Sequence, residues 1–369
     1  MHDTEYMSLC LELAKQGMGQ VSPNPMVGAV IVKSGRIIGK GYHGKAGEAH
    51  AEIAALRSCN HDPVGATLYV NLEPCCHYGQ TPPCVDEISK AGIVRVVFGM
   101  QDPNPLVQGR GADTLKAAGI IVEDGILEKD CQQLNRIFTY WITKKRPYIM
   151  AKAAVSADWK IAKQKGVRTQ ITGSESQKKV HELRRLCDAI LVGVDTVIVD
   201  DPLLTVRHSA AISANSPDSE ENREPLCIIL DSQLRIPSNA KVLANQNVLI
   251  ATTADASAKK KSEIEKKGIS CILFPKTSSG VDLAAVLEYC ATRQITSILV
   301  EGGAKVFNSF LQAHLINEWH IFQNNKNIGD QGVDFCSNVS IIADRIEQSE
   351  EQVLGSDKYY YLKGHAIVY

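Results

Sequence analysis

Three residues in the first quarter of the chain have the types and spacing of a zinc site. His50 is followed by a Pro-Cys pair that ends at Cys75 and by a second Pro-Cys pair that ends at Cys84. A neutral imidazole and two thiolates can hold Zn²⁺ at three corners of a tetrahedron, which leaves the fourth corner open for water. Because zinc lowers the pKa of such a water toward neutrality, these residues predict a hydrolytic metal centre.

Glu52 lies two residues after the histidine and can move protons without taking a coordination position. Hydrolytic deamination of a nucleobase-like ring needs this combination, because water attacks the ring carbon while a nearby acid/base serves the departing ammonia. The general zinc-deaminase signature has two residues between its cysteines, whereas eight residues separate Cys75 from Cys84 here. We therefore predict a deaminase centre of unusual spacing, with Glu52 as the proton shuttle.

A closed structural zinc site is the alternative, with Cys76 or His77 as a fourth ligand. Such a site would leave Glu52 without a role. Its ligands also do not form the compact knuckle that is typical of structural zinc. The catalytic interpretation is favoured on these two grounds.

The surrounding elements predict where these residues meet. A helix is expected to open at His50, so that His50 and Glu52 lie in its first turn, and an apolar strand over 67–72 ends just before Cys75. The alternation of strands and helices predicts an α/β sandwich with the site at strand C-termini and helix N-termini. The other elements predicted for the first half are helices over 4–17, 85–91, 113–118 and up to 144, and strands over 26–33, 37–43, 95–99 and 120–123.

The charged run Lys144-Lys145-Arg146 before Pro147 predicts a boundary between domains 1–146 and 147–369.

In the second domain, the predicted strand over 297–300 is followed by Glu301-Gly302-Gly303 and then by a helix. Paired glycines let backbone approach a ligand closely, and a helix N-terminus can bind a cofactor phosphate, although a plain strand-to-helix turn has the same pattern. The other predicted strands are 148–155, 189–194, 226–231, 247–252, 270–274 and 318–323, and the predicted helices are 174–186, 254–267, 283–293 and 304–313.

Size and composition limit the class of protein. The chain has 369 residues, a formal net charge of −1 and 44% hydrophobic residues, which suits two globular domains and gives no basic excess for nucleic-acid binding. No apolar run reaches the length of a membrane span, and the N-terminus does not resemble a signal peptide. Eleven cysteines, mostly single and in apolar surroundings, are typical of a reducing compartment. We expect a cytoplasmic protein that binds neither nucleic acid nor membrane, and by base rate a homo-oligomer.

With these motifs on two fused domains, the chain resembles the bifunctional deaminase/reductase family of riboflavin biosynthesis. The resemblance covers nearly the whole chain. It implies an α/β fold in both halves: an N-terminal three-layer sandwich like cytidine deaminase and a C-terminal domain like dihydrofolate reductase. It also implies Zn²⁺ and NADPH as cofactors and a phosphorylated pyrimidine as substrate. Besides the zinc motifs, the segments that carry it are 22–28 (SPNPMVG), 101–105 (QDPNP), 200–207 (DDPLLTVR) and 301–303 (EGG).

The resemblance implies two reactions and the residues that serve them. The first domain would remove the ring amino group of 2,5-diamino-6-ribosylamino-4(3H)-pyrimidinone 5′-phosphate, with His50, Cys75 and Cys84 on zinc. Asn24 would bind the substrate there, since an amide offers both a donor and an acceptor, although it also suits a turn between prolines. The second domain would use NADPH to reduce the ribosyl group to ribityl. The residues implied at its substrate are Arg184, Leu204, Arg207 and Glu301, and those along the cofactor are Ala154, Thr196, Asp200, Ser232, Gly302 and Gly303. Arg184 and Arg207 could bind the substrate's phosphate through their guanidinium groups, although they also suit plain surface arginines.

Two departures from the family pattern leave alternatives open. Trp159 stands where the family usually has glycine, and Gln170 stands where it usually has tryptophan. The C-terminal half could then be a non-catalytic binding or dimerisation module. The zinc site, taken alone, also suits a deaminase of free nucleotides or of tRNA.

Overall fold

The computed structural model describes residues 2–77, 82–105, 107–206, 224–245, 247–336 and 346–364. The chain forms two compact units, Met1–Lys145 and Arg146–Tyr369. The division lies inside the charged run that precedes Pro147. Among the described residues, no helix is long and apolar enough to cross a membrane.

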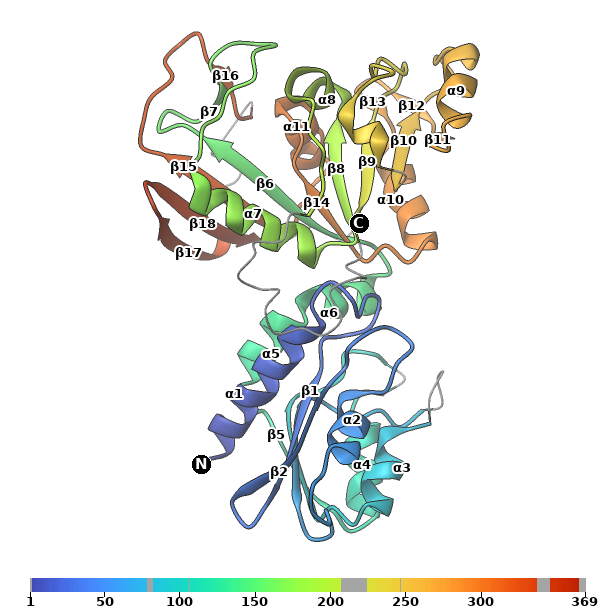
Figure 1. The fold of residues 1–369 in the computed structure, drawn as a ribbon, viewed down its shortest axis with the longest axis vertical. Helices are drawn as coiled ribbons and strands as arrows, with labels where there is room; N and C mark the ends of the chain where they lie inside the picture. The colour runs from blue at the N-terminus through green and yellow to red at the C-terminus, as the bar shows by residue number, and fades with distance from the viewer. Residues whose placement is uncertain are drawn as a thin grey trace. The chain divides into compact units, whose positions relative to one another are not determined.

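The first unit is a three-layer α/β sandwich, as the sequence predicts (Figure 1). Its sheet has the order β2-β1-β3-β4-β5, antiparallel from β2 to β3 and parallel from β3 to β5. Helices α1 and α5 lie on one face, and α2, α3 and α4 lie on the other. Strands β1, β3 and β4 are buried on both faces, which explains why their sequences are continuous apolar runs.

The elements of this unit are α1 (Asp3–Ala14), η1 (Lys15–Gly17), β1 (Gly28–Lys33), β2 (Arg36–Tyr42), α2 (Ala51–Arg57), β3 (Thr67–Leu72), α3 (Cys84–Lys90), β4 (Arg95–Met100), α4 (Arg110–Ala117), β5 (Ile121–Asp124), α5 (Glu128–Leu134) and α6 (Arg136–Lys144). The last predicted helix is thus two helices. They separate at Asn135, whose side chain accepts a hydrogen bond from Met26 N at 2.8 Å and donates one to Met26 O at 3.0 Å.

The second unit is built on a nine-stranded sheet in the order β11-β10-β9-β8-β14-β6-β15-β18-β17. The strands from β11 to β15 run parallel, and β18 and β17 are antiparallel. One apolar core lies between the sheet and helices α10 and α11, and another includes residues of α8 and α9. This mixed α/β architecture confirms the fold class that the family resemblance implies for this half.

The elements of the second unit are β6 (Tyr148–Val155), β7 (Lys160–Ala162), α7 (Ser174–Leu186), β8 (Ala189–Gly193), α8 (Val194–Asp200), β9 (Leu226–Leu230), η3 (Lys241–Ala244), β10 (Val248–Thr252), α9 (Ala258–Glu265), β11 (Ser270–Leu273), β12 (Lys276–Thr277), β13 (Gly280–Val281), α10 (Leu283–Thr292), β14 (Ser297–Val300), α11 (Ala304–Gln312), β15 (Glu318–Asn324), β16 (Val333–Asp334), β17 (Ile346–Leu354) and β18 (Asp357–Gly364).

Several of these elements have no counterpart among the predicted ones: the helices α8 and η3, the strands β17 and β18, and the short strands β7, β12, β13 and β16. Helix α8 has the sequence VDTVIVD, whose β-branched residues favour a strand in isolation, so it reads as a continuation of β8. Strand β17 is the polar edge of the sheet, with the sequence IEQSEEQVL, and lacks the apolar alternation that marks a half-buried strand.

Candidate active sites

The metal centre of the first unit is assembled at one strand end and two helix starts. His50 is the N-cap of α2, one position before its first turn, and Glu52 lies in that turn. Cys75 follows the end of β3, and Cys84 is the first residue of α3. Residues far apart in sequence therefore meet because β3, α2 and α3 end or begin at the same edge of the sheet.

The geometry of the three side chains fits a zinc ion. His50 Nδ1 lies 3.2 Å from Cys84 Sγ and 3.5 Å from Cys75 Sγ. A tetrahedral zinc with ordinary Zn–N and Zn–S bonds places such atoms about 3.5 Å apart. All three ligand atoms lie within 4.8 Å of one another. Among the described residues this group has three members, and neither Cys76 nor His77 belongs to it, so the geometry gives no support to a closed four-ligand site.

The two thiols interact through a side-chain hydrogen bond in this arrangement. Cys84 donates to Cys75, which lowers the pKa of the Cys75 thiol and raises the pKa of the Cys84 thiol. A divalent cation that binds both sulfurs must displace that proton, so metal binding at this site is coupled to proton release.

Glu52 lies beside the metal ligands with a carboxyl group suited to proton transfer. It is only 4% exposed. Burial raises the pKa of Glu52 to about 7, and the nearby Cys75 contributes in the same direction. A carboxyl that titrates near neutrality can both accept and release a proton at working pH, which general acid–base catalysis requires.

Asn24 is held close to the metal ligands through its side chain. Its Nδ2 lies 3.1 Å from His43 Nε2, and the ring of His43 stands edge-on to the ring of His50 at 5.7 Å between centroids. The structure thus places this predicted substrate residue next to the metal centre.

Three buried polar side chains that sequence reasoning missed fix the loops around this centre. Asn71 and Asn135 hold Met26 and Gly28 by hydrogen bonds of 2.8–3.0 Å. Glu73, which directly precedes Pro74-Cys75, accepts hydrogen bonds from the backbone N–H groups of Asp102, Gly109 and Ala112 at 3.0–3.2 Å. For Asn71 and Glu73, the available signal was a polar residue within or just after a buried strand, because such a group needs a partner.

In the second unit, a cavity of ≈ 360 Å³ brings together most of the residues predicted for the reductase. Gln170 also lines it. Gly302 and Gly303 directly follow the lining residue Glu301, and Ser232 lies just beyond the C-terminal end of β9. Arg207 lies outside the described residues. The predicted residues that line the cavity are Ala154, Arg184, Thr196, Asp200, Leu204 and Glu301.

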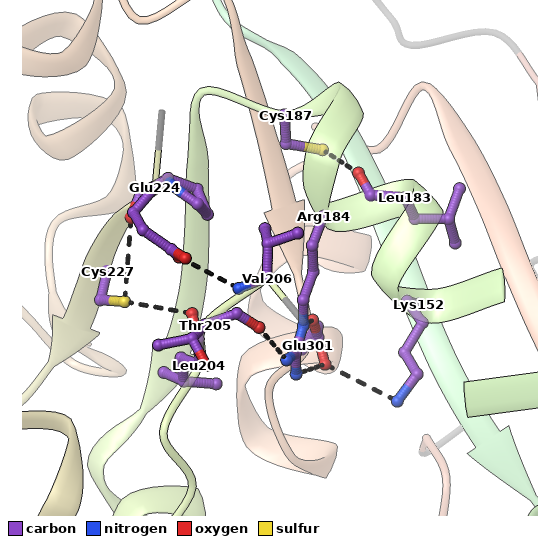
Figure 2. A network of polar contacts seen from close by, with 11 residues as sticks. Lys152, Leu183, Arg184, Cys187, Leu204, Thr205, Val206, Glu224, Cys227 and Glu301 are labelled. Atoms are coloured by element: carbon purple, nitrogen blue, oxygen red, sulfur yellow. Dashed lines mark hydrogen bonds and ion pairs between the residues drawn. The ribbon is translucent and has the colours of Figure 1, made fainter. Parts of the chain in front are cut away.

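Arg184 and Glu301 form a bidentate ion pair at this cavity (Figure 2). Arg184 Nε donates to Glu301 Oε1 at 2.6 Å and Nη2 donates to Oε2 at 3.0 Å, while Nη1 donates to Thr205 O at 3.0 Å. Three of the five guanidinium N–H bonds are therefore used within the protein. The phosphate-binding role predicted for Arg184 can draw only on the remaining two.

Lys152 completes this charged group and is the residue that sequence reasoning missed in the second unit. Its Nζ lies 3.7 Å from Glu301 Oε2, and it lines the cavity from strand β6. Burial lowers the pKa of Lys152, partly offset by the charge of Glu301. A lone lysine in an apolar strand was the signal, because a buried ammonium must face a partner or a polar cavity.

The N-termini of α8 and α11 offer a place for an anionic cofactor group. No described side chain caps either helix, whose N-caps are Gly193 and Gly303. A Cβ on Gly303 would lie 3.7 Å from Thr196 Oγ1, so the two helix starts are neighbours. Free N–H groups on adjacent helix N-termini suit a dinucleotide phosphate, and the residues present therefore fit NADPH.

Trp159 does not block this cavity. Its backbone has φ +60°, which explains why glycine is favoured at this position. Its ring packs near Phe335, at 6.3 Å between centroids, and contacts the apolar core. Trp159 is not among the residues that line the cavity.

The contribution of Glu301 to this charged group can be tested by measuring the free energy of unfolding. Glu301→Gln leaves Arg184 and Lys152 buried without a counter-ion, and removal of one partner of a buried ion pair costs about 3–5 kcal/mol. We expect that loss in the free energy of unfolding of the second unit, measured by denaturant titration. Asp195→Asn is the matched control, because Asp195 is half-exposed in its pair with Arg235, and exposed pairs contribute about 0–1 kcal/mol. Equal losses in the two variants would contradict the assignment.

The same carboxyl makes stability depend on pH. Burial alone raises the pKa of Glu301, but the charges of Arg184 and Lys152 outweigh it and lower the pKa to about 2, from 4.5 in the unfolded chain. A lowered folded-state pKa contributes stability that is complete above about pH 4.5 and lost as the pH falls toward about 2. We expect the difference in the free energy of unfolding between the wild type and Glu301→Gln to decrease as the pH falls over that interval. A difference that does not change with pH would contradict this interpretation.

Comparisons with known proteins match both units of the chain. Residues 1–100 match the family model of the cytidine and deoxycytidylate deaminase zinc-binding region, and residues 147–359 match that of the RibD C-terminal domain. The chain is 41% identical over 332 residues to the riboflavin biosynthesis protein RibD of Actinobacillus pleuropneumoniae, which covers 89% of this chain and 85% of that protein. It is also 41% identical over 337 residues to RibD of Aquifex aeolicus, covering 90% and 91%.

Solved structures extend the likeness to the whole fold. RibD of Acinetobacter baumannii superposes with a TM-score of 0.85 at 35% identity, covering 98% of this chain and 99% of that one. A diaminohydroxyphosphoribosylaminopyrimidine deaminase/5-amino-6-(5-phosphoribosylamino)uracil reductase from Thermotoga maritima superposes with a TM-score of 0.83 at 35% identity and the same coverage. The chain belongs to the RibD family of bifunctional riboflavin-biosynthesis enzymes, in which a zinc-binding deaminase domain precedes a reductase domain.

Proposed function

We propose that the first unit deaminates 2,5-diamino-6-ribosylamino-4(3H)-pyrimidinone 5′-phosphate, and that the second reduces the ribosyl group of the product to ribityl with NADPH. The activities named for the Thermotoga maritima relative support this substrate. The observation that carries the proposal is the three-ligand group of His50, Cys75 and Cys84 with the buried Glu52 beside it.

In the deaminase, zinc on these three ligands would supply a water of lowered pKa. The Glu52 carboxylate takes a proton from that water and delivers it to the nitrogen that leaves as ammonia. Asn24 presents its amide to the pyrimidine edge and orients the ring within the site. Burial of Glu52 keeps the transferred proton from bulk solvent.

In the reductase, NADPH would supply the hydride to C1′ of the ribosyl group. We assign Lys152 to the proton transfer that accompanies opening of the ribosyl ring, because it lines the cavity, its Nζ lies beside Glu301 and burial lowers its pKa. Glu301 orients Lys152 and Arg184, and the Arg184 N–H bonds that remain can contact the substrate. Ala154, Thr196, Asp200, Ser232, Gly302 and Gly303 are proposed along the cofactor, and Leu204 and Arg207 at the substrate.

A coupled assay tests both activities together. With the diaminopyrimidine ribotide as substrate, ammonia release should precede NADPH oxidation, and NADPH should be oxidised only once ammonia has been formed. Ammonia release without NADPH oxidation would leave the second unit as a binding or dimerisation module. Ammonia release from cytidine, deoxycytidylate or tRNA, and none from the ribotide, would favour the other deaminase classes.

We further propose a cytoplasmic homo-oligomer, on the evidence of the cysteine usage and of the prevalence of symmetric assemblies. Sedimentation equilibrium of the full chain measures the oligomeric state directly.

A further inference from the structure

A hydrogen-bonded chain of groups joins Asn24 to the segment that carries the metal ligand His50. Asn24 Nδ2 lies 3.1 Å from His43 Nε2, and His43 Nδ1 lies 3.1 Å from the backbone oxygen of Ala49. His43 is 3% exposed, and its ring stands at 79° to that of His50. Ala49 directly precedes His50. The imidazole of His43 is thus fixed from both of its nitrogens.

The direction of each hydrogen bond follows from elementary chemistry. A carbonyl oxygen only accepts, so His43 Nδ1 must carry the proton that it donates to Ala49 O. In a neutral imidazole the other nitrogen then has a lone pair, and Nε2 can only accept. The group facing it is therefore the Asn24 NH₂, and the Asn24 amide cannot turn over without placing its oxygen against that lone pair.

We propose that His43 is a positioning residue for the deaminase: it sets the orientation of the Asn24 amide and thereby the ring edge that the site accepts. This inference rests on the proposed role of Asn24 as a substrate ligand. Oδ1 and the second Nδ2 hydrogen of Asn24 have no partner among the described residues, and they form an adjacent acceptor and donor.

The Oδ1 acceptor and the Nδ2–H donor of Asn24 complement the 4(3H)-pyrimidinone ring, in which N3–H is a donor and the neighbouring C4 oxygen is an acceptor. An amide turned by 180° would place donor against donor and acceptor against acceptor. A site built to hydrogen-bond a ring discriminates strongly against mispaired analogues, because its own polar groups are left unsatisfied. His43 therefore contributes to selectivity without touching the reacting atoms.

Two substitutions separate the two hydrogen bonds of His43. In His43→Gln, the side-chain oxygen can accept from Asn24 near the former Nε2 position, while the bond to Ala49 is lost. In His43→Asn, the side-chain amide can still donate to Ala49 O near the former Nδ1 position, while the bond to Asn24 is lost. Zinc content, thermal midpoint, kcat and KM for the ribotide are measured on the zinc-loaded full chain.

If His43 acts through Asn24, His43→Asn should raise KM about ten-fold or more, the effect expected from one lost hydrogen bond in a buried site. His43→Gln should restore a KM close to that of the wild type. Asn24→Ala should have an effect like that of His43→Asn, and the double variant should be no worse than either single variant. Additive effects of the two substitutions would overturn the proposal, because His43 would then contact the substrate independently.

A spectroscopic measurement keeps the test independent of variant folding and of substrate binding. Imidazole ¹⁵N chemical shifts of wild-type protein should show His43 as the Nδ1–H tautomer, with Nε2 unprotonated. The opposite tautomer would overturn the proposal even if Asn24 proves to bind substrate. A wild-type KM for Asn24→Ala combined with the expected tautomer would instead reject the proposed role of Asn24, and with it the functional consequence inferred for His43.

Discussion

Glu52→Gln is expected to lower the deaminase kcat by about 10²–10⁴-fold, the range that a positioned general acid/base contributes. The amide keeps the size of the side chain but cannot exchange a proton. Zinc content and KM for the ribotide should remain close to those of the wild type, because Glu52 is not among the metal ligands. Ammonia release and bound zinc, measured on the same preparation, separate the loss of proton transfer from loss of metal.

Glu48→Gln is the matched control for this prediction. Glu48 is an exposed residue close to His50 in sequence, and the same chemical change there should leave kcat within about two-fold of the wild type, as for most surface substitutions. Near-normal ammonia release from Glu52→Gln would remove Glu52 from the mechanism.

Lys152→Met is expected to lower the reductase activity by about 10²–10⁴-fold, while the deaminase activity of the same chain remains unchanged. Methionine keeps much of the length of the side chain and removes the ammonium that lines the cavity. NADPH binding, followed by fluorescence titration, should persist, because Lys152 is not among the residues proposed along the cofactor. The intact deaminase serves as an internal control for the amount of folded protein.

Two further variants distinguish proton transfer from simple charge balance. Lys152→Arg keeps a positive charge opposite Glu301 but cannot release its proton, so it should remain inactive if Lys152 moves protons. Reductase activity in that variant would show that Lys152 acts only as a counter-ion of Glu301. Lys160→Met removes a lysine whose partner is the exposed Asp334, outside the cavity, and should leave reduction unchanged.

The sequence predicted the parts of this molecule that depend on local patterns. Apolar runs marked β1, β3 and β4 because these strands are covered on both faces. The four residues of the metal centre could be named because zinc chemistry restricts ligand types and because His50 and Glu52 are two positions apart. Helix α8 was missed because its β-branched sequence favours a strand until the tertiary contacts of Val194 and Val197 with the core are known.

Long-range pairs were beyond the reach of the sequence. Arg184 was predicted to be free for a phosphate, whereas its main partner, Glu301, lies 117 positions away. Asn135 contacts Met26 across 109 positions, so its role in holding the substrate loop could be found only in the structure. Tryptophan in place of the usual glycine at position 159 suggested that cofactor binding could be lost. In the structure, the left-handed backbone of Trp159 directs the ring toward Phe335.

The most direct test of the account is zinc-edge X-ray absorption on purified protein, combined with metal analysis. Chemistry at the first site needs one zinc per chain with one nitrogen and two sulfur ligands, and one light-atom ligand that exchanges with solvent. We expect this four-atom shell with Zn–S distances of about 2.3 Å. A shell made entirely of protein ligands, or full deaminase activity in metal-free protein, would contradict the account.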